Sequence, residues 1–440
     1  MMSGISGLVI AVAAVVITIV VSRKTGFNMG IMAMAMAMVV GCMLGGMKVK
    51  AVLAEFDTDL FLLQFIPMLF FAEVQQCDAF GGIVDRIVYA SRKRGWMIPF
   101  ALWAATFFIG AIGAGNYGTP AIASPIAFAL ARSAGFSPLI ASYIVYSASL
   151  LCAYMPWNSN TLNLTGIALN YVDEATAANV LTVVRLVLFT FMILIFLGIY
   201  FVKKGYKSKA IEVEKPAPLT PEQKKVLIVL AVFLAVVCLP GILNLLIKNN
   251  PVISWAVRVF DVRAVCLFGT FVLHVMRLGN VKEALTKKVP WNTILLITGM
   301  SSFINVLNSL GVFETVGDIV NNNLPTAAIP FALALTCALL GAVTAGISTV
   351  MPAFTPIAYA FAQSAGLNTV GIMALVMTTP TAASVSPLST GGSFAMVGAT
   401  EEERSKLFVE QFIVCGIQIA LMVVLAGIGL HLGLADLLGF

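Results

Sequence analysis

Long apolar runs follow one another along almost the whole chain, and short polar segments separate them. An α-helix needs about 20 apolar residues to cross the roughly 30 Å hydrocarbon layer of a bilayer. By this criterion the pattern predicts membrane helices over 5–22, 28–46, 60–76, 138–172, 177–202, 224–248, 260–277, 291–311, 370–399 and 407–433. We therefore expect an all-α integral membrane protein.

Two further apolar stretches, 97–132 and 328–363, are too long for one crossing and have middles rich in Gly, Pro, Ser and Thr. Each can enter the membrane and return on the same side, so we predict two re-entrant hairpins. The runs 138–172 and 370–399 are also too long and contain proline near the middle. Proline removes a backbone donor and clashes with the preceding turn, which predicts two broken helices.

The chain repeats itself at an offset of 231 residues. GAIGAGNYGTPAIASPIAFALARSAG (110–135) aligns without a gap on GAVTAGISTVMPAFTPIAYAFAQSAG (341–366), and nearly half of these positions are identical. The same offset places Pro156 on Pro387. We predict a first repeat over 1–202, a linker over 203–223 and a second repeat over 224–440. Each repeat would hold five crossings and one hairpin, so the second is inverted, as in many secondary transporters.

The composition agrees with a membrane protein and suggests its orientation. The chain is 60% apolar and 10% charged, against about 25% charged residues in soluble domains. Nearly all loop Lys and Arg fall on one side of the predicted topology, and this side includes the lysine-rich linker. Cytoplasmic loops carry such an excess. We expect a multi-pass protein of the cell (inner) membrane with a cytoplasmic linker and both termini outside.

Other features of the composition narrow the classes of partner. The formal net charge of +6 lies in short loop clusters, which indicates no nucleic-acid partner. The seven cysteines are scattered and form no CxxC, so we expect neither a disulfide framework nor a cysteine metal site.

The hairpin tips and the helix breaks are the candidate site. Irregular backbone at membrane depth is tolerated where it lines a cavity or is buried in protein. Freed N–H groups at half-helix N-termini favour anions, whereas carbonyl, amide and hydroxyl oxygens suit a cation. The candidate substrate-binding residues are Asn116, Tyr117, Thr119, Asn158, Ser159, Asn160, Thr161, Ser348, Thr349, Ser389, Thr390, Gly391 and Gly392. The candidate Na⁺ ligands are Gly115, Asn116, Pro156, Asn158, Ser348 and Ser386.

The four irregular segments contain no Lys or Arg. A helix N-terminus contributes only about 0.3–1 kcal/mol to anion binding, rising to about 2 kcal/mol when partly buried. A dianion would therefore need a co-bound cation, and Na⁺ coupling follows as a hypothesis. Glu73 and Glu410 lie near the predicted cytoplasmic edge, where we expect structural or interfacial roles.

Three segments carry a resemblance to a known family: FDTDLFLLQF (56–65), VPWNTILLITGM (289–300) and SPLSTGGSFAMVG (386–398). With them the chain resembles the ion-transporter superfamily, and within it the malonate and dicarboxylate carriers related to the divalent-anion/sodium symporters. The resemblance covers nearly the whole chain. It implies a homodimer whose scaffold regions make the dimer contact, while hairpins and broken helices move as an elevator. It also implies that Na⁺ and substrate carboxylates meet the hairpin tips and breaks.

The resulting hypothesis is a secondary active transporter that couples Na⁺ to a small di- or monocarboxylate, with no further cofactor. An H⁺-driven carrier of another organic anion or amino acid is the main alternative. A channel would need a continuous polar stripe, which these helices lack outside the breaks. A membrane enzyme is disfavoured because the sequence shows no HExxH and no paired membrane aspartates.

Overall fold

The protein is all-helical over the residues that the computed structural model describes, and no strand occurs among them. These residues are 5–56, 58–77, 79–111, 115–212, 214–246, 250–289, 291–312, 325–343 and 346–440. The prediction of an all-α protein is therefore confirmed.

The first half of the chain forms ten α-helices in the described residues, with short 3₁₀ and π turns between some of them. They are α1 (Ile5–Thr25), α2 (Met29–Met38), α3 (Val49–Ala54), α4 (Thr58–Val74), α5 (Ala79–Ser91), α6 (Ile98–Ile109), α7 (Gly115–Ala134), α8 (Pro138–Cys152), α9 (Ser159–Leu169) and α10 (Glu174–Val202).

The second half adds further helices, again within the described ranges. They are α11 (Pro221–Leu246), α12 (Pro251–Val259), α13 (Val262–Val275), α14 (Val281–Glu283), α15 (Trp291–Ser309), α17 (Ile329–Val343), α18 (Met351–Ala365), α19 (Thr369–Ala383), α20 (Thr390–Ala395), α21 (Glu401–Gly427) and α22 (Leu430–Leu437). The π-helical turn Gly346–Val350 leads into α18.

Local side-chain chemistry explains where many of these helices begin. Free N–H groups in a first helical turn need acceptors, and Ser, Thr, Asp and Asn supply them. Ser137 caps α8, Asp173 caps α10 and Asn368 caps α19. Thr400 and Glu403 form a reciprocal capping box at the start of α21.

Both long apolar stretches fold as two packed helices. α6 contacts α7, and α17 contacts α18. The second helix of each pair ends at a glycine in the left-handed region, Gly135 (φ +74°) and Gly366 (φ +64°). Glycine adopts this conformation without a Cβ clash. These two positions are separated by the same 231-residue offset that aligns the sequences.

Three features differ from the sequence prediction. The described part of the structure adds four helices that were not expected, namely α3, α5, α12 and the three-residue α14. The segment predicted as one helix over 407–433 is divided into α21 and α22, because Gly429 has φ +86°. The second broken helix continues only as the six-residue α20 instead of reaching 399.

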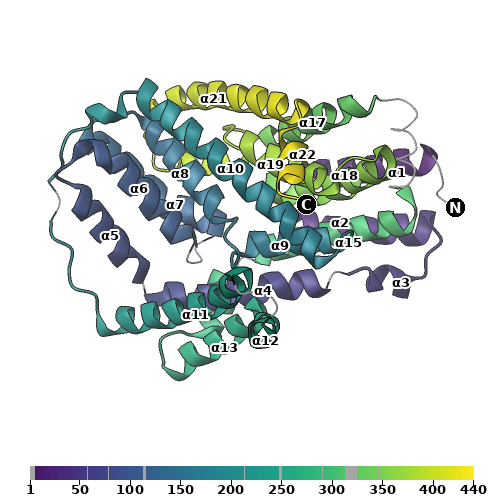
Figure 1. The fold of residues 1–440 in the computed structure, drawn as a ribbon, viewed down its shortest axis with the longest axis horizontal. Coiled ribbons are helices and arrows are strands. Elements are labelled where there is room, and N and C mark those ends of the chain that lie inside the picture. The colour runs from purple at the N-terminus through teal and green to yellow at the C-terminus, as the bar shows by residue number, and fades with distance from the viewer. Residues whose placement is uncertain are drawn as a thin grey trace.

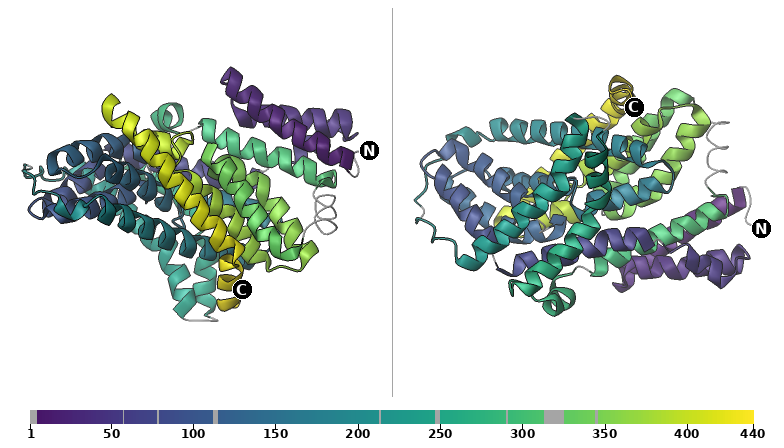
Figure 2. Two further views of the ribbon diagram at one scale, coloured as in Figure 1. Left: turned by 90° about the horizontal axis from the view of Figure 1, so that it is seen from above. Right: turned by 60° about the horizontal axis from the view of Figure 1, so that its bottom comes forward.

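The buried side chains separate into one large core and three small ones. The large core joins α5–α10 with α17–α22. One small core is formed by α1, α2, α3 and α15. A second is formed by α4, α11 and α13. The third lies between α4 and the π-helical turn Ala284–Lys288. In Figures 1 and 2 the helices α11–α13 form an edge of the molecule away from α21, and α1 and α2 lie together beside α15.

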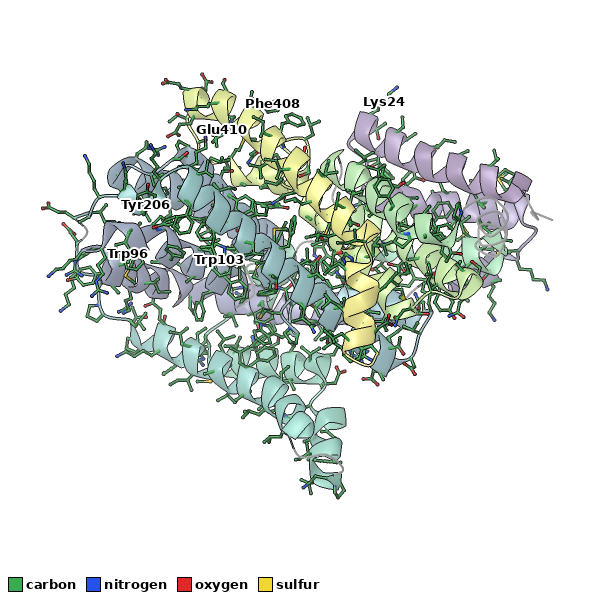
Figure 3. The ribbon with its side chains drawn as sticks, turned by 45° about the horizontal axis from the view of Figure 1, so that its top comes forward. Lys24, Trp96, Trp103, Tyr206, Phe408 and Glu410 are labelled. Atoms are coloured by element: carbon green, nitrogen blue, oxygen red, sulfur yellow. The ribbon has the colours of Figure 1, made fainter. Side chains whose placement is uncertain are left out.

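Two helices in the described part of the chain, α10 and α21, are long and apolar enough to cross a membrane by length and composition. Several shorter apolar helices accompany them. Lys203 at the end of α10 pairs with Glu410 of α21 at 2.8 Å, which gives Glu410 a structural partner. At this end of the molecule Trp96 and Tyr206 are half-exposed (Figure 3), as expected for aromatic side chains at a membrane–water interface.

The linker lies against the ends of the first hairpin and its neighbours. The Lys209 amide donates to Ala134 O at 2.7 Å, and the Ile211 amide donates to Arg92 O at 3.0 Å. Arg86 donates to Ala217 O at 2.8 Å. The described linker residues therefore contact α5, the turn that follows it and the end of α7.

Candidate functional site

The two helix breaks occupy equivalent positions at the 231-residue offset. α8 ends at Cys152 and α9 begins at Ser159, while α19 ends at Ala383 and α20 begins at Thr390. Asn158 caps α9 by accepting from the Asn160 amide at 3.1 Å. Its equivalent, Ser389, caps α20 by accepting from the Gly392 amide at 3.2 Å. The same type of local interaction therefore restarts both helices.

Two buried tyrosines join the breaks to each other. The Tyr146 hydroxyl of α8 donates to Thr381 O at 2.7 Å. The Tyr154 hydroxyl, at the start of the first break, lies 2.7 Å from Thr381 Oγ1. All three residues are buried, so Thr381 links the two halves inside the protein.

Each hairpin tip packs against the break of its own half. The Trp157 indole of the first break donates to Ala111 O at 2.6 Å, next to the first tip. In the second half, a Cβ at Gly346 would come within 2.8 Å of Pro380 O and 2.9 Å of Ser384 Oγ. Glycine is required there because the backbone of the hairpin approaches the broken helix this closely.

A narrow pocket lies where these elements meet. Its lining comes from both hairpins, α8 and the second break: Pro120, Tyr146, Ser149, Leu150, Gly346, Ile347, Ser384, Thr390, Gly391 and Phe394. The lining contains no charged side chain. Ser149 Oγ is buried and has no hydrogen-bond partner among the described residues. The pocket has a volume of about 20 Å³, which is room for about one water molecule. It therefore presents hydroxyl groups and close backbone contact, but a carboxylate fits only when the surrounding elements move apart.

The predicted residues of the second break have different surroundings. Thr390 and Gly391 line the pocket. The Ser389 hydroxyl is already used, because Ser384 O and Ser386 O share its single proton and its oxygen accepts from the Gly392 amide. Gly392 is a buried residue in the first turn of α20. Ser386 is buried, and its hydroxyl accepts from the Leu388 amide at 3.3 Å.

The predicted residues of the first break are mostly buried. Asn158, Asn160 and Thr161 are each about 3% exposed, and Thr161 donates to Ala153 O at 3.1 Å. Pro156 is exposed. At the first tip, Thr119 is fully buried.

Other predicted positions lie partly outside the description. The side chains of five predicted residues, and the burial of Gly115, lie outside the described part of the structure. These five are Asn116, Tyr117, Ser159, Ser348 and Thr349. The proposed Na⁺ ligand set therefore stays a prediction.

Sequence reasoning missed two polar residues beside the first break. Arg185 of α10 is partly buried, and its Nε donates to Tyr154 O at 2.9 Å. Asn163 of α9 is 1% exposed, and both of its amide atoms lack partners among the described residues. A lone arginine inside the apolar run 177–202 was the available signal, because ionisable residues in membrane segments are commonly functional. A cationic side chain therefore lies beside the first break, although none lines the pocket.

A family model described as citrate transporter matches residues 12–382. The chain belongs to the citrate transporter family. Membership makes it a multi-pass membrane transporter, and it confirms the resemblance to ion transporters at the broad level. The narrower assignment to malonate and dicarboxylate carriers stays a prediction.

The fold of this citrate transporter family member also occurs in a solved structure. The chain is similar to MtrF of Neisseria gonorrhoeae, which is described with a class of antimetabolite efflux pumps. The TM-score is 0.53 at 14% identity, over 86% of this chain and 83% of that chain. This similarity shows a shared fold alone. No curated protein matches the sequence.

Proposed function

We propose that the protein is a secondary active transporter that carries a small carboxylate, such as citrate, in symport with Na⁺. The observation that supports this best is the pocket at Thr390 and Gly391, where two hairpin tips and a broken helix converge. Family membership supports a carboxylate as the substrate. The separation of one large core from three small ones supports an elevator, in which the hairpins and broken helices move as one body.

One observation favours H⁺ as the coupling ion. Glu73 of α4 is fully buried, and neither carboxyl oxygen has a hydrogen-bond partner among the described residues. Gly279 lies so close that a Cβ there would be 3.1 Å from Glu73 Oε1. An unpaired carboxylate in an apolar environment is strongly disfavoured against the protonated acid. Glu73 is therefore the candidate proton site of the alternative, an H⁺-driven carrier.

Uptake of citrate and succinate into proteoliposomes separates these candidates. With equal pH on both sides, we expect uptake to require an inward Na⁺ gradient and to be unchanged in Glu73→Gln. Uptake that does not depend on Na⁺ but requires an inward H⁺ gradient would support the H⁺-driven carrier. Glu73→Gln should then abolish the dependence of uptake on pH. Accumulation of neither carboxylate under either gradient would contradict the proposed function itself.

We also predict that the two hairpins enter the membrane from opposite faces. Arg92, Lys93, Arg94 and Arg132 flank the first hairpin, whereas no basic residue flanks the second. In a cysteine-free background, single cysteines at Ser133 and Ser364 should react with an impermeant thiol reagent from opposite sides. Labelling of both from the same side would contradict the inverted repeat. A single cysteine in the linker 203–223, which is predicted to be cytoplasmic, serves as the control for that side.

A further inference from the structure

The 231-residue offset extends from the sequence to the contacts around the breaks. α20, which follows the second break, packs on α7 of the first hairpin. In the equivalent contact, α9 packs on α18 of the second hairpin. The Ser124 hydroxyl of α7 donates to Ala395 O at 3.0 Å in the first of these contacts. Each half-helix therefore meets the hairpin of the other half.

The 231-residue offset also aligns the pocket residues of α20 with residues of α9 in the first half. Gly391 and Phe394 line the pocket, and the offset places them on Asn160 and Asn163. These two asparagines are three residues apart in α9, so they share one helix face. Where the second half has a glycine and a phenylalanine, the first half therefore presents two amides.

The two amides are buried and incompletely bonded. Asn160 is 3% exposed and Asn163 is 1% exposed. The Nδ2 atoms of both residues, and Oδ1 of Asn163, have no hydrogen-bond partner among the described residues. Buried polar groups are nearly always hydrogen-bonded, and an unbonded one destabilises the fold. Two such amides on one face, in the first two turns of the eleven-residue α9, indicate a ligand that supplies the missing partners.

The chemistry of the unpaired atoms identifies the ligand group. Two Nδ2 groups are donors, and the N-terminal part of a helix favours negative charge. A carboxylate accepts from both donors, and a hydroxyl beside it can bond Asn163 Oδ1. Tyr154 next to this break and Tyr146 in the pocket both contact Thr381. The first break and the pocket therefore both adjoin Thr381.

We propose that Asn160 and Asn163 form a second carboxylate subsite, and that Asn163 selects substrates with two or more carboxylates over monocarboxylates. This inference rests on the proposed function. In it, one carboxylate of the substrate lies beside Thr390 and Gly391, and another accepts from the two asparagine amides.

The test compares citrate and succinate with butyrate, a monocarboxylate that matches succinate in chain length. In Asn163→Leu, we expect the affinity of purified protein for citrate and succinate to fall at least tenfold, with little change for butyrate. The same variant should raise the melting temperature of ligand-free protein, because leucine removes two unbonded polar atoms. Asn170→Ala, at the exposed end of α9, should leave both properties unchanged.

Asn163→Asp distinguishes a carboxylate from a cation at this subsite. A negative charge repels a carboxylate, so citrate and succinate binding should fall further than in Asn163→Leu. Unchanged binding, or binding that strengthens with Na⁺, would overturn the carboxylate assignment. An equal loss of affinity for citrate, succinate and butyrate in Asn163→Leu would overturn the proposal that Asn163 selects substrates by their number of carboxylates.

Two results distinguish a failure of the asparagine subsite from a failure of the proposed function. If Asn163→Leu does not fold, Asn163→Ala and Asn160→Ala provide the same comparison, and wild-type affinity in both would overturn the subsite. Wild-type protein that binds no carboxylate, measured as no thermal stabilisation by any of the three acids, would contradict the proposed function. Wild-type binding that the variants leave unchanged contradicts only the subsite.

Discussion

Gly392→Ala is expected to remove most of the folded protein. A Cβ at this position would overlap the carbonyl oxygens of Ser386 and Val385, which are backbone atoms of the same break. Backbone cannot move aside as a flexible side chain does, so overpacking here should cost about 3 kcal/mol or more. The change would also displace the amide that Ser389 caps.

The measurement is the yield of monodisperse protein in detergent and its melting temperature. Gly416→Ala in α21 is the matched control, because a Cβ there meets nothing within 4 Å. It should behave as wild type or gain slightly in stability, since alanine favours helix. Normal yield and melting temperature in Gly392→Ala would show that the break is looser than its contacts indicate.

Gly391 should respond differently from its neighbour. A Cβ there would lie 2.8 Å from Ser384 O and 3.4 Å from the Tyr146 ring, and it would face the pocket. Gly391→Ala should therefore reduce transport more than it reduces folded yield. Comparing uptake per folded molecule between the two variants separates a role in packing from a role in ligand approach.

Arg185→Ala is the second change with a large expected effect. Its Nε donates to Tyr154 O, just past the last turn of α8, where carbonyl oxygens carry partial negative charge. A hydrogen bond from a charged group contributes about 1.5–3 kcal/mol. Loss of the guanidinium should therefore lower carboxylate uptake by more than tenfold, because it also removes a positive charge beside the break.

Two further substitutions divide the effect of Arg185 into its parts. Arg185→Lys keeps the charge but not the planar donor group, so it should retain intermediate uptake. Arg185→Gln keeps a donor without charge and should resemble alanine if attraction of the anion dominates. Arg404→Ala, at an exposed position, serves as control. Wild-type uptake per folded protein in Arg185→Ala would exclude both contributions.

Much of the fold could be predicted from the sequence because its signals are local. Apolar runs determine which segments become helices, and proline, glycine and capping residues determine where they end. Both helix breaks lie where the Pro156 and Pro387 segments predicted them. Predictions were weakest at 79–91 and 251–259, where short helices lack a run long enough to cross a membrane, and at Gly429, where one glycine divides a helix.

The candidate site depended on the tertiary structure because its contacts join distant segments. Thr390 of the second break lines one pocket with Pro120 of the first hairpin and Gly346 of the second, and only packing brings these segments together. The sequence alone determined that polar, helix-breaking segments occur in the membrane at a constant offset. Only the tertiary structure decided that Arg185 reaches Tyr154 and that Asn163 is buried without a hydrogen-bond partner among the described residues. The physical reason is that hydropathy and helix termination act between near neighbours in the chain, whereas burial and hydrogen-bond partners depend on helices that meet only after folding.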